Sequence, residues 1–252
     1  MEYLLSFAQI NEDIVLYHLL GGVEMPKKVF WIDIGANDPI FLSVTKFFSM
    51  RGGRGINVEP QKDCIDQYEL DRKNDINLCV AVGAEKGTLK LYGTGTGASL
   101  NRDEVETIGE TNCVNVPVRT LKDICEEYVE TNQIIHFLKI DVEGFEAQVL
   151  RGADFNNYRP WILCIEASEH EWEEELINYG YANIWNDGQN RWYALKEHHE
   201  IIERASLLDK FDELYDVTSR STLIVINQEY QAIKSSNSWK WACKIRKALK
   251  GK

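Results

Sequence analysis

The chain has 252 residues, 44% of them hydrophobic, and a formal net charge of −12. This length and composition can bury one sizeable core, which predicts a single globular domain with appendages. The acidic excess argues against nucleic-acid binding, because phosphate backbones are bound by clustered Lys and Arg. The charge is uneven, however, since residues 234–252 hold seven basic side chains and no acidic one.

The cysteines and the N-terminus bear on the cellular compartment. The six cysteines are scattered and include no C-x-x-C pair, which is typical of reduced thiols rather than of a zinc or redox site. The N-terminus lacks a basic region followed by a long apolar run, and no apolar stretch approaches the roughly 20 residues of a membrane span. We therefore expect a cytoplasmic protein that is neither secreted nor transmembrane.

Apolar runs and helical patterns alternate along the chain. A helix at residues 11–20 precedes a continuous run of Val, Ile and aromatic residues, which is typical of a strand buried on both faces. The alternation predicts an α/β fold with a doubly wound, mostly parallel sheet and right-handed crossovers. The predicted strands are 29–34, 55–60, 76–83, 134–141 and 161–166, with an extra strand at 88–92 beside the third. The predicted helices between them are 41–50, 62–72, 121–129 with Thr120 as its cap, 146–150 and 172–179.

The C-terminal part adds an antiparallel hairpin and then a weaker pattern. Its turn, residues 187–190, has the Asp-Gly composition of a tight hairpin. The expected elements are strands at 181–186 and 191–195, a helix at 198–208, and at 221–233 either a helix or a strand over 222–226. Residues 93–112 are rich in Gly, Thr and Asn and predict a loop, either a mobile one over the carboxyl edge of the sheet or an ordinary surface loop.

Residues 238–252 have the pattern of a basic amphipathic helix. One face gathers Trp241, Ile245, Ala248 and Leu249, and the basic side chains lie opposite. Such a helix can lie on an anionic membrane or dock to a partner protein. The pattern therefore predicts an association that is peripheral to the inner face of a membrane, or a contact with another protein.

Four acidic residues fall at the carboxyl ends of four predicted core strands: Asp33, Glu59, Asp141 and Glu166. Open α/β sheets bind their ligands at these ends, and a glycine turn such as the one at Gly35 lets the backbone approach a ligand closely. An acid after the second strand can accept hydrogen bonds from both ribose hydroxyls. Enzymes that use dinucleotides and enzymes that use S-adenosylmethionine share this arrangement.

The residues after the first strand distinguish the two cofactors. A dinucleotide site requires G-x-G-x-x-G so that a helix N-terminus meets the pyrophosphate, whereas the sequence from Gly35 reads Gly-Ala-Asn-Asp-Pro. Asp38 would also repel a phosphate, while a sulfonium and an amino group would be attracted by Asp33 and the other acids. We therefore favour methyl transfer, with an NAD-dependent oxidoreductase as the alternative.

Several motifs also resemble those of FkbM-type methyltransferases over about residues 7–199. They are residues 31–39, Gly-Ile-Asn-Val-Glu-Pro at 55–60, the run Leu-Lys-Ile-Asp-Val-Glu-Gly-Phe-Glu at 138–146, and Asp-Gly-Gln-Asn-Arg-Trp-Tyr at 187–193. The resemblance implies a Rossmann-like class I fold and an O-methyltransferase that uses S-adenosylmethionine to modify sugars or natural products. We divide the chain into an N-terminal helical segment (1–28), a methyltransferase domain (29–199), a helical extension (200–237) and a basic amphipathic tail (238–252).

The same resemblance assigns cofactor-binding residues. It implies that the turn binds the methionine part of the cofactor, that Gln9 reaches its carboxylate, and that Glu59 binds the ribose. Pro39 departs from the family pattern, because a glycine often stands there. The residues expected to contact the cofactor are Gln9, Asp33, Gly35, Ala36, Asn37, Glu59, Pro60, Ala81, Val82 and Asp141.

Methylation of a hydroxyl requires a base and a correctly oriented acceptor. Asp141 is the first candidate for that base or for a ligand of Mg²⁺, with Glu166 as a second ligand and Glu143 beside them. His170 is a further candidate base, although a solvated surface histidine is the simpler interpretation. The residues expected to contact the acceptor are Asp38, Lys139, Asn190, Arg191 and Tyr193, with hairpin packing and ion pairing as alternative roles.

The sequence thus predicts a methyltransferase that acts on a hydroxyl of a sugar in a glycan, or of a nucleotide-linked or lipid-linked saccharide. A non-catalytic module that binds the cofactor and tethers a glycosyltransferase or a membrane is the alternative from a different functional class.

Overall fold

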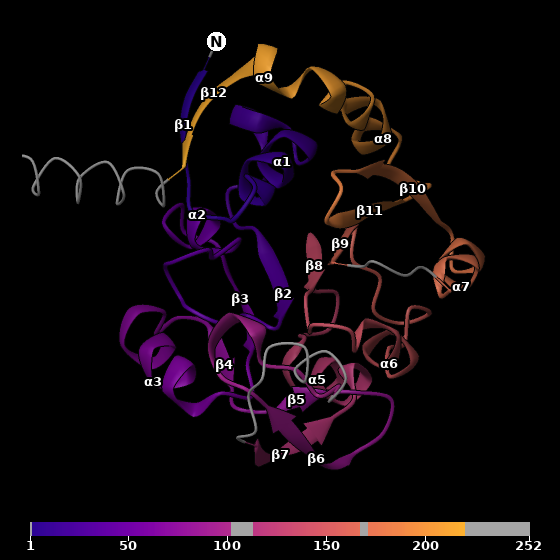
Figure 1. Ribbon diagram of the computed structural model, residues 1–252. Helices are drawn as coiled ribbons and strands as arrows, with labels where there is room; N and C mark the ends of the chain where they lie inside the picture. The colour runs from indigo at the N-terminus through magenta and orange to yellow at the C-terminus, as the bar shows by residue number, and fades with distance from the viewer. Residues whose placement is uncertain (1, 102–112, 167–170, 220–252) are drawn as a thin grey trace, which may run out of the picture.

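The computed structural model describes residues 2–101, 113–166 and 171–219. Within these ranges a seven-stranded sheet runs through the molecule (Figure 1), in the order β10-β11-β9-β8-β2-β3-β4. The neighbours from β9 to β4 are all parallel, and β11 is antiparallel to both β9 and β10. The strands are β2 (Phe30–Ile34), β3 (Arg54–Val58), β4 (Ile76–Leu78), β8 (Phe137–Ile140), β9 (Ile162–Glu166), β10 (Tyr181–Asn186) and β11 (Asn190–Leu195). The predicted fold class, a mostly parallel sheet with a C-terminal hairpin, is confirmed.

Helices pack on both faces of this sheet. Successive residues of β2 alternate between the faces, so Trp31 joins one core cluster and Phe30 and Ile32 join the other. The first cluster also contains side chains of α1 (Glu12–Leu19), α2 (Lys46–Ser49) and α8 (His199–Ala205). The second contains side chains of α5 (Leu121–Tyr128), α6 (Glu146–Arg151) and α7 (Glu173–Asn178). This two-sided core is what a doubly wound sheet requires.

Most of the predicted helices are present with small shifts at their ends. Thr120 caps α5 as predicted, because its hydroxyl oxygen accepts a hydrogen bond from the backbone N–H of Asp123 at 3.1 Å. Helix α3 (Lys62–Asp71) also follows its prediction, and the helix predicted at 198–208 becomes α8 and the short η3 (Leu208–Lys210). The candidates at 221–233 and the tail at 238–252 lie outside the described residues.

The helix predicted at 41–50 is wrong over its first half. Only Lys46–Ser49 forms α2, and the preceding residues form a turn. The Asp38 carboxylate accepts the backbone N–H groups of Ile40 and Phe41 at 2.8 and 2.6 Å, and Leu42 adopts a left-handed conformation with φ of 56°. A left-handed residue interrupts a right-handed helix, so the helix begins only after it.

The third predicted strand divides between two sheets. β4 pairs with β3 in the central sheet, whereas β5 (Ala81–Val82) pairs with β7 (Cys113–Arg119) in a separate three-stranded sheet of order β5-β7-β6. The extra strand predicted beside the third, β6 (Gly87–Tyr92), pairs with β7 instead. This correction follows from β7, a strand that the sequence did not predict.

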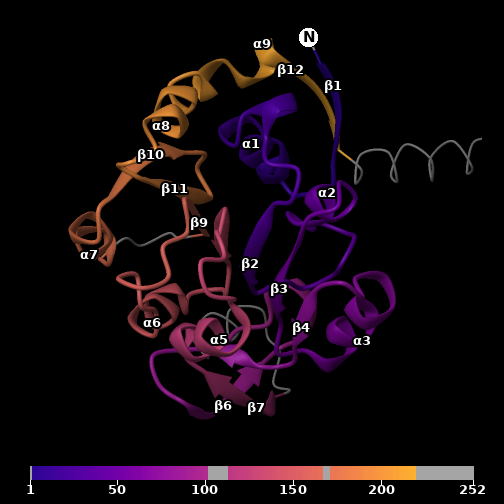
Figure 2. The same ribbon diagram turned by 180° about the vertical axis from the view of Figure 1, so that it is seen from behind.

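The two ends of the described chain meet in a further sheet. β1 (Glu2–Ser6) and β12 (Tyr215–Ser219) pair in parallel and lie side by side near α1 in both views (Figures 1 and 2). Between β12 and α8 lie η3 and α9 (Phe211–Leu214). The segments predicted as helical at 1–28 and 200–237 therefore each contain a strand as well as helices. None of the helices in the described ranges combines the length and apolarity needed to cross a membrane.

Candidate functional site

A cavity of about 270 Å³ opens at the carboxyl ends of β2, β3 and β8. Fourteen of the residues predicted from the sequence line it. They are Gln9, Asp33, Gly35, Ala36, Asn37, Asp38, Glu59, Pro60, Ala81, Val82, Lys139, Asp141, Glu143 and Glu166. The structure therefore brings every predicted cofactor residue to one place, including Gln9 from the loop that precedes α1.

The turn after β2 is fixed by its neighbours on both sides. The backbone N–H groups of Gly35 and Ala36 donate to the carbonyl oxygen of Val58 at 3.0 and 3.1 Å, and the N–H of Asp141 donates to that of Ile34 at 3.0 Å. Gly35 has a φ of 80°, and a Cβ at this position would lie 1.7 Å from the Asp141 carbonyl oxygen. Only glycine fits here, because the position combines a left-handed conformation with close backbone contact.

Glu59 is held rigidly at the end of β3. One carboxylate oxygen accepts the backbone N–H of Asn37 at 3.0 Å, and the other accepts that of Gln61 at 2.9 Å. Its side chain is buried against the cavity, and this burial raises the pKa of Glu59 while the two backbone donors oppose the rise. Each oxygen has a further lone pair, so the carboxylate can accept two hydroxyl groups from a ligand.

A row of polar side chains crosses the sheet beneath the cavity. The strand register sets Asp33 beside Asn57 on β3 and beside Lys139 on β8, all on the same face. The Lys139 ammonium lies 2.7 Å from Asp141 Oδ2. Burial lowers the pKa of Lys139, but the charges of Asp141 and Asp33 outweigh it and raise that pKa, so the side chain stays charged. Lys139 thus forms its ion pair with Asp141, which is the ion-pairing role that the sequence offered as an alternative to acceptor binding.

Asp33 has one carboxylate oxygen without a protein partner among the described residues. Its Oδ1 is fully buried and unpaired, whereas Oδ2 accepts the Thr45 hydroxyl at 3.4 Å. Burial raises the pKa of Asp33, and the charges of Lys139 and Arg72 oppose the rise. A buried polar atom without a partner is costly, so this oxygen is suited to a donor on a bound ligand.

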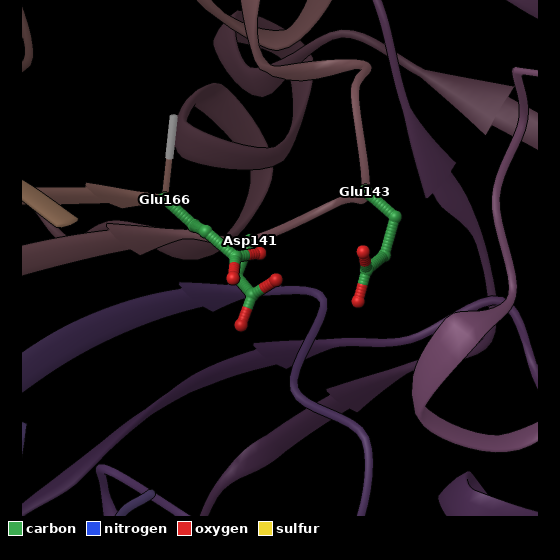
Figure 3. A group of neighbouring side chains, drawn as sticks. All are labelled: Asp141, Glu143 and Glu166. Atoms are coloured by element: carbon green, nitrogen blue, oxygen red, sulfur yellow. The ribbon is translucent and has the colours of Figure 1, made fainter. Parts of the chain in front are cut away.

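Asp141, Glu143 and Glu166 bring carboxylate oxygens within 4.8 Å of one another. In Figure 3 the carboxyl groups of Asp141 and Glu166 face each other, and that of Glu143 lies to one side. A hydrogen bond from Glu166 to Asp141, together with burial, raises the pKa of Glu166. Burial raises the pKa of Asp141, but Lys139 and that hydrogen bond outweigh it and lower the pKa. Near neutral pH the pair therefore shares one proton, with Asp141 as the more acidic member and Glu166 as the less acidic one.

Three of the predicted acceptor residues lie outside the cavity lining. The amide group of Asn190 donates to Asp187 at 3.1 Å, and Arg191 pairs with Glu173 at 3.7 Å. Tyr193 is fully buried, and its hydroxyl donates to Glu173 at 3.2 Å. In this arrangement Asp187 and its neighbours build the hairpin turn. His170 lies outside the described residues.

Several residues that line the cavity were not predicted as site residues from the sequence. Gln61 bonds to Gly95 through both its amide oxygen and its amide nitrogen, at 2.7 and 2.9 Å, and so holds the loop after β6 over the cavity. Phe41 is 45% exposed at the cavity, on the turn fixed by Asp38. An apolar wall completes the lining, with Val80, Leu91, Ala98 and Leu100.

Comparison with known proteins gives the family. A model of the Methyltransferase FkbM domain matches residues 33–210, which is most of the chain. The chain belongs to the FkbM methyltransferase family. No curated protein matches it.

Two solved structures also align with this FkbM family member. A crystal structure of methyltransferase FkbM from Methylobacillus flagellatus KT aligns with a TM-score of 0.41 and 16% identity, over 71% of this chain and 47% of that one. The METTL16 MTase domain aligns with a TM-score of 0.41 and 14% identity, over 73% of this chain and 65% of that one. The present chain thus spans about half of the length of the first structure and 65% of the second.

The family implies S-adenosylmethionine as cofactor, and the cavity of this FkbM chain has features that fit it. The unpaired Asp33 oxygen suits a cationic or hydrogen-bond-donating group, and Glu59 suits a pair of hydroxyl groups. Gly35 lines the cavity, and Val80 to Val82 offer an apolar surface for a flat ring. Family membership and the lining of the cavity therefore agree on S-adenosylmethionine as the cofactor to test.

Proposed function

We propose that the protein transfers a methyl group from S-adenosylmethionine to a hydroxyl of a sugar, in a glycan or in a nucleotide-linked or lipid-linked saccharide. The observation that carries this proposal is the pair formed by Asp141 and Glu166 with Lys139, at the edge of a cavity that has the features of a cofactor site. The pair offers an ionised carboxylate and a proton donor side by side.

Asp141, Lys139 and Glu166 have different roles in the proposed reaction. S-adenosylmethionine supplies an activated methyl group on a sulfonium, ready for in-line attack by an oxygen nucleophile. Asp141 accepts the proton of the acceptor hydroxyl at a carboxylate oxygen, and Lys139 holds that carboxylate in place. Glu166 stays protonated near neutral pH and donates a hydrogen bond to one oxygen of Asp141, which fixes the orientation of the base. A weak base is sufficient because orientation supplies most of the effect.

The charge of the cavity bears on the acceptor. Among the described lining residues Lys139 is the one basic side chain, and six are acidic: Asp33, Asp38, Glu59, Asp141, Glu143 and Glu166. A uronic acid or phosphate next to the reacting hydroxyl would be repelled by this lining. The lining favours a neutral sugar at the reacting position, with any phosphate of the saccharide held outside the cavity.

Asp141 and Glu166 were also expected as ligands of Mg²⁺. The Lys139 ammonium, 2.7 Å from Asp141 Oδ2, already brings positive charge to the three carboxyl groups, and the proton on Glu166 occupies another potential ligand. We therefore derive no step through a metal, and we expect methyl transfer to persist in EDTA. Loss of activity in EDTA with recovery on added Mg²⁺ would contradict this expectation.

The activity is tested with labelled S-adenosylmethionine and a panel of neutral and acidic saccharides. We expect label in a neutral saccharide, and loss of most turnover in Asp141→Asn even at saturating S-adenosylmethionine. Binding of S-adenosylhomocysteine without turnover on any saccharide would favour a non-catalytic module. Turnover that is unchanged in Asp141→Asn would remove Asp141 from its role as base.

The basic tail, residues 238–252, is proposed to bind an anionic membrane surface or a glycosyltransferase partner. Its charge of one sign and its apolar face support this role. The full chain and a chain truncated after Asn237 can be compared by flotation with vesicles containing phosphatidylserine. We expect the truncated chain to keep its fold and cofactor affinity but to lose vesicle binding, and an unfolded truncated chain would instead place the tail in the core.

A further inference from the structure

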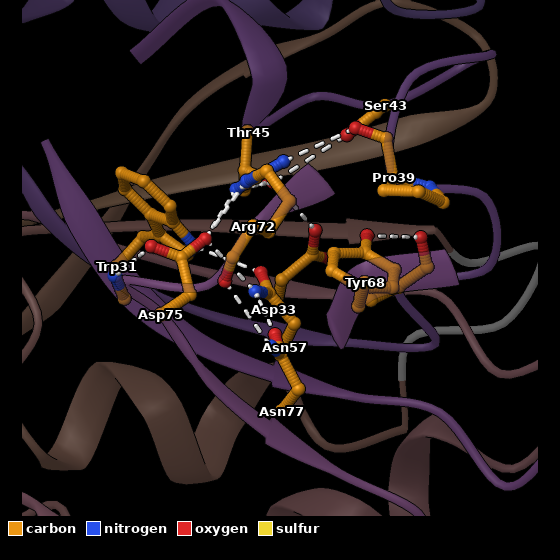
Figure 4. A network of polar contacts seen from close by, with 12 residues as sticks. Trp31, Asp33, Pro39, Ser43, Thr45, Asn57, Tyr68, Arg72, Asp75 and Asn77 are labelled. Carbon is orange, nitrogen blue, oxygen red and sulfur yellow. Dashed lines mark hydrogen bonds and ion pairs between the residues drawn. The ribbon is translucent and has the colours of Figure 1, made fainter. Parts of the chain in front are cut away.

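Arg72 is a fully buried cation beneath the cofactor turn. The Arg72 side chain is 0% exposed, and the side chain of its ion-pair partner, Asp75, is 2% exposed. The guanidinium lies 2.8 Å from Asp75 Oδ2, and Asp75 also accepts the Asn57 side-chain amide at 3.1 Å. Asn57 in turn accepts the indole N–H of Trp31 at 3.0 Å. Figure 4 shows this network, which extends from the end of α3 to the central strand β2.

The remaining donors of Arg72 point at the segment that follows β2. One Nη donates to the carbonyl oxygen of Pro39 at 3.2 Å, and the other donates to the Thr45 hydroxyl oxygen at 3.0 Å. These contacts hold both ends of the 39–45 turn against a rigid planar group. This turn contributes Phe41, Leu42 and Val44 to the cavity lining.

Thr45 connects Arg72 to Asp33. Its hydroxyl accepts from Arg72, so its single proton is available to Asp33 Oδ2, 3.4 Å away. The Ser43 hydroxyl lies 3.5 Å from the Thr45 hydroxyl oxygen, which makes it a longer alternative partner for Thr45. A carboxylate that receives this donor on Oδ2 is held in one orientation, while its Oδ1 has no protein partner in the described part of the chain. Asp33 is one of the residues that line the cavity.

We propose that Arg72 is a positioning residue for cofactor binding, acting through Thr45 on Asp33 and through the Pro39 carbonyl on the turn. This inference rests on the proposed function, because it assigns Asp33 to the cofactor. Arg72 touches neither the cavity nor a reacting atom, so it acts by fixing the direction and the ionised state of Asp33.

The charges around Asp33 make the pH dependence of binding informative. Burial raises the pKa of Asp33; Lys139 and Arg72 lower it, while Asp141 raises it. Two further groups face it from β3 and α3, namely Glu59 and the buried Tyr68. Removal of the Arg72 charge should therefore raise the pKa of Asp33, and cofactor affinity should then be lost at a higher pH than in the wild type.

The test uses calorimetry with S-adenosylhomocysteine on the full chain between pH 5 and 8, with thermal melting to confirm folding. Thr45→Val removes the hydroxyl and keeps the shape, and Arg72→Gln removes the charge. Arg54→Gln is the matched control, because Arg54 forms an exposed pair with Glu130. We expect Thr45→Val to weaken binding about tenfold, in line with one hydrogen bond to a charged group, and Arg72→Gln to weaken it further and shift the pH profile upward.

The outcomes separate this proposal from the proposed function. Wild-type affinity in a folded Thr45→Val at every pH would overturn the relay, even if Arg72→Gln failed to fold. Equal losses in Arg54→Gln would also overturn it, because the effect would then not be specific to the buried network. If the wild type itself bound no S-adenosylhomocysteine, the proposed function would fail first.

Discussion

The sequence could predict the positions of the cavity's strand-end acids, because each lies at or next to the carboxyl end of a strand with a clear apolar pattern. Asp33, Glu59, Asp141 and Glu166 all line one cavity, since parallel strands end at the same edge of the sheet. Arg72 and Thr45 could not be found in this way. Their positions depend on how α3 and the 39–45 turn pack against β2, and a single buried Arg leaves no periodic signal.

Gly35 offers a matched comparison with Gly52. Both are left-handed, with φ of 80° and 83°, but a Cβ at Gly52 would meet no atom within 4 Å, whereas one at Gly35 would collide with the Asp141 carbonyl. We expect Gly52→Ala to cost about 1–2 kcal/mol of unfolding free energy from its conformation alone. Gly35→Ala should cost more and should abolish cofactor binding. Chemical denaturation of both variants measures the difference, and equal costs would show that the close contact is unimportant.

Glu59 should contribute through its charge as well as its shape. In Glu59→Gln the amide N–H₂ would face the backbone N–H of Asn37 or Gln61, which now donates to a carboxylate oxygen. We expect affinity for S-adenosylhomocysteine to fall by about 1.5–3 kcal/mol. Glu85→Gln, at an exposed position, is the control. An unchanged affinity in Glu59→Gln would remove this residue from the ribose site.

At the scale of elements, the segment between β2 and α2 is where the sequence misled. Its apolar spacing favoured a helix from residue 41, but the Asp38 carboxylate and the left-handed Leu42 make a turn instead. Asn37 and Glu143, at the same cavity, are left-handed as well. Backbone strain of this kind is often concentrated at functional sites, and local propensity does not reveal it.

Phe41 on this turn is expected to contact the acceptor. A half-exposed ring at the rim of a cavity can pack against the apolar face of a neutral sugar. Phe41→Ala should therefore raise the KM for the saccharide several-fold, by about 1 kcal/mol, with little change in affinity for S-adenosylhomocysteine. Leu70→Ala, an exposed residue outside the lining, should change neither. A large loss of cofactor affinity in Phe41→Ala would place the ring over the cofactor.

At the scale of the molecule, the pairing of β1 with β12 joins residues more than 200 positions apart. No hairpin turn or crossover helix links β1 directly to β12, so local sequence patterns could not predict that they pair. The β1–β12 sheet lies next to a segment that lines the cavity, namely the one between β1 and α1. Asp13 holds this segment in place, because its carboxylate accepts the Ser6 hydroxyl and the Phe7 N–H at 2.6 and 2.7 Å. This segment carries Gln9 to the cavity.

The stability of the whole fold should depend on His136 in acid. Burial lowers the pKa of His136 to about 4, and its Nδ1 accepts the Phe30 N–H at 3.0 Å, a hydrogen bond that only the neutral ring can accept. The folded state therefore binds the proton less well than the unfolded state, whose histidine has a pKa near 6.5. The contribution of His136 to the free energy of unfolding is therefore fully present above pH 6.5. About 3 kcal/mol of it is lost as the pH falls towards 4.

His136→Asn isolates this contribution from the buried carboxyl groups, because Asn does not titrate and can still accept from Phe30. We expect the unfolding free energy of the wild type, relative to the variant, to fall by about 3 kcal/mol between pH 7 and pH 4. Urea unfolding at each pH measures it. A difference that stays constant across this range would show that His136 titrates normally in the folded chain.

The cavity at the carboxyl ends of β2 and β3 is proposed to bind S-adenosylmethionine. Calorimetry of the full chain with S-adenosylhomocysteine and with NAD tests it most directly. We expect saturable binding of S-adenosylhomocysteine, loss of that binding in Gly35→Ala but not in Gly52→Ala, and no binding of NAD. Saturable binding of NAD with no response to S-adenosylhomocysteine would contradict the account.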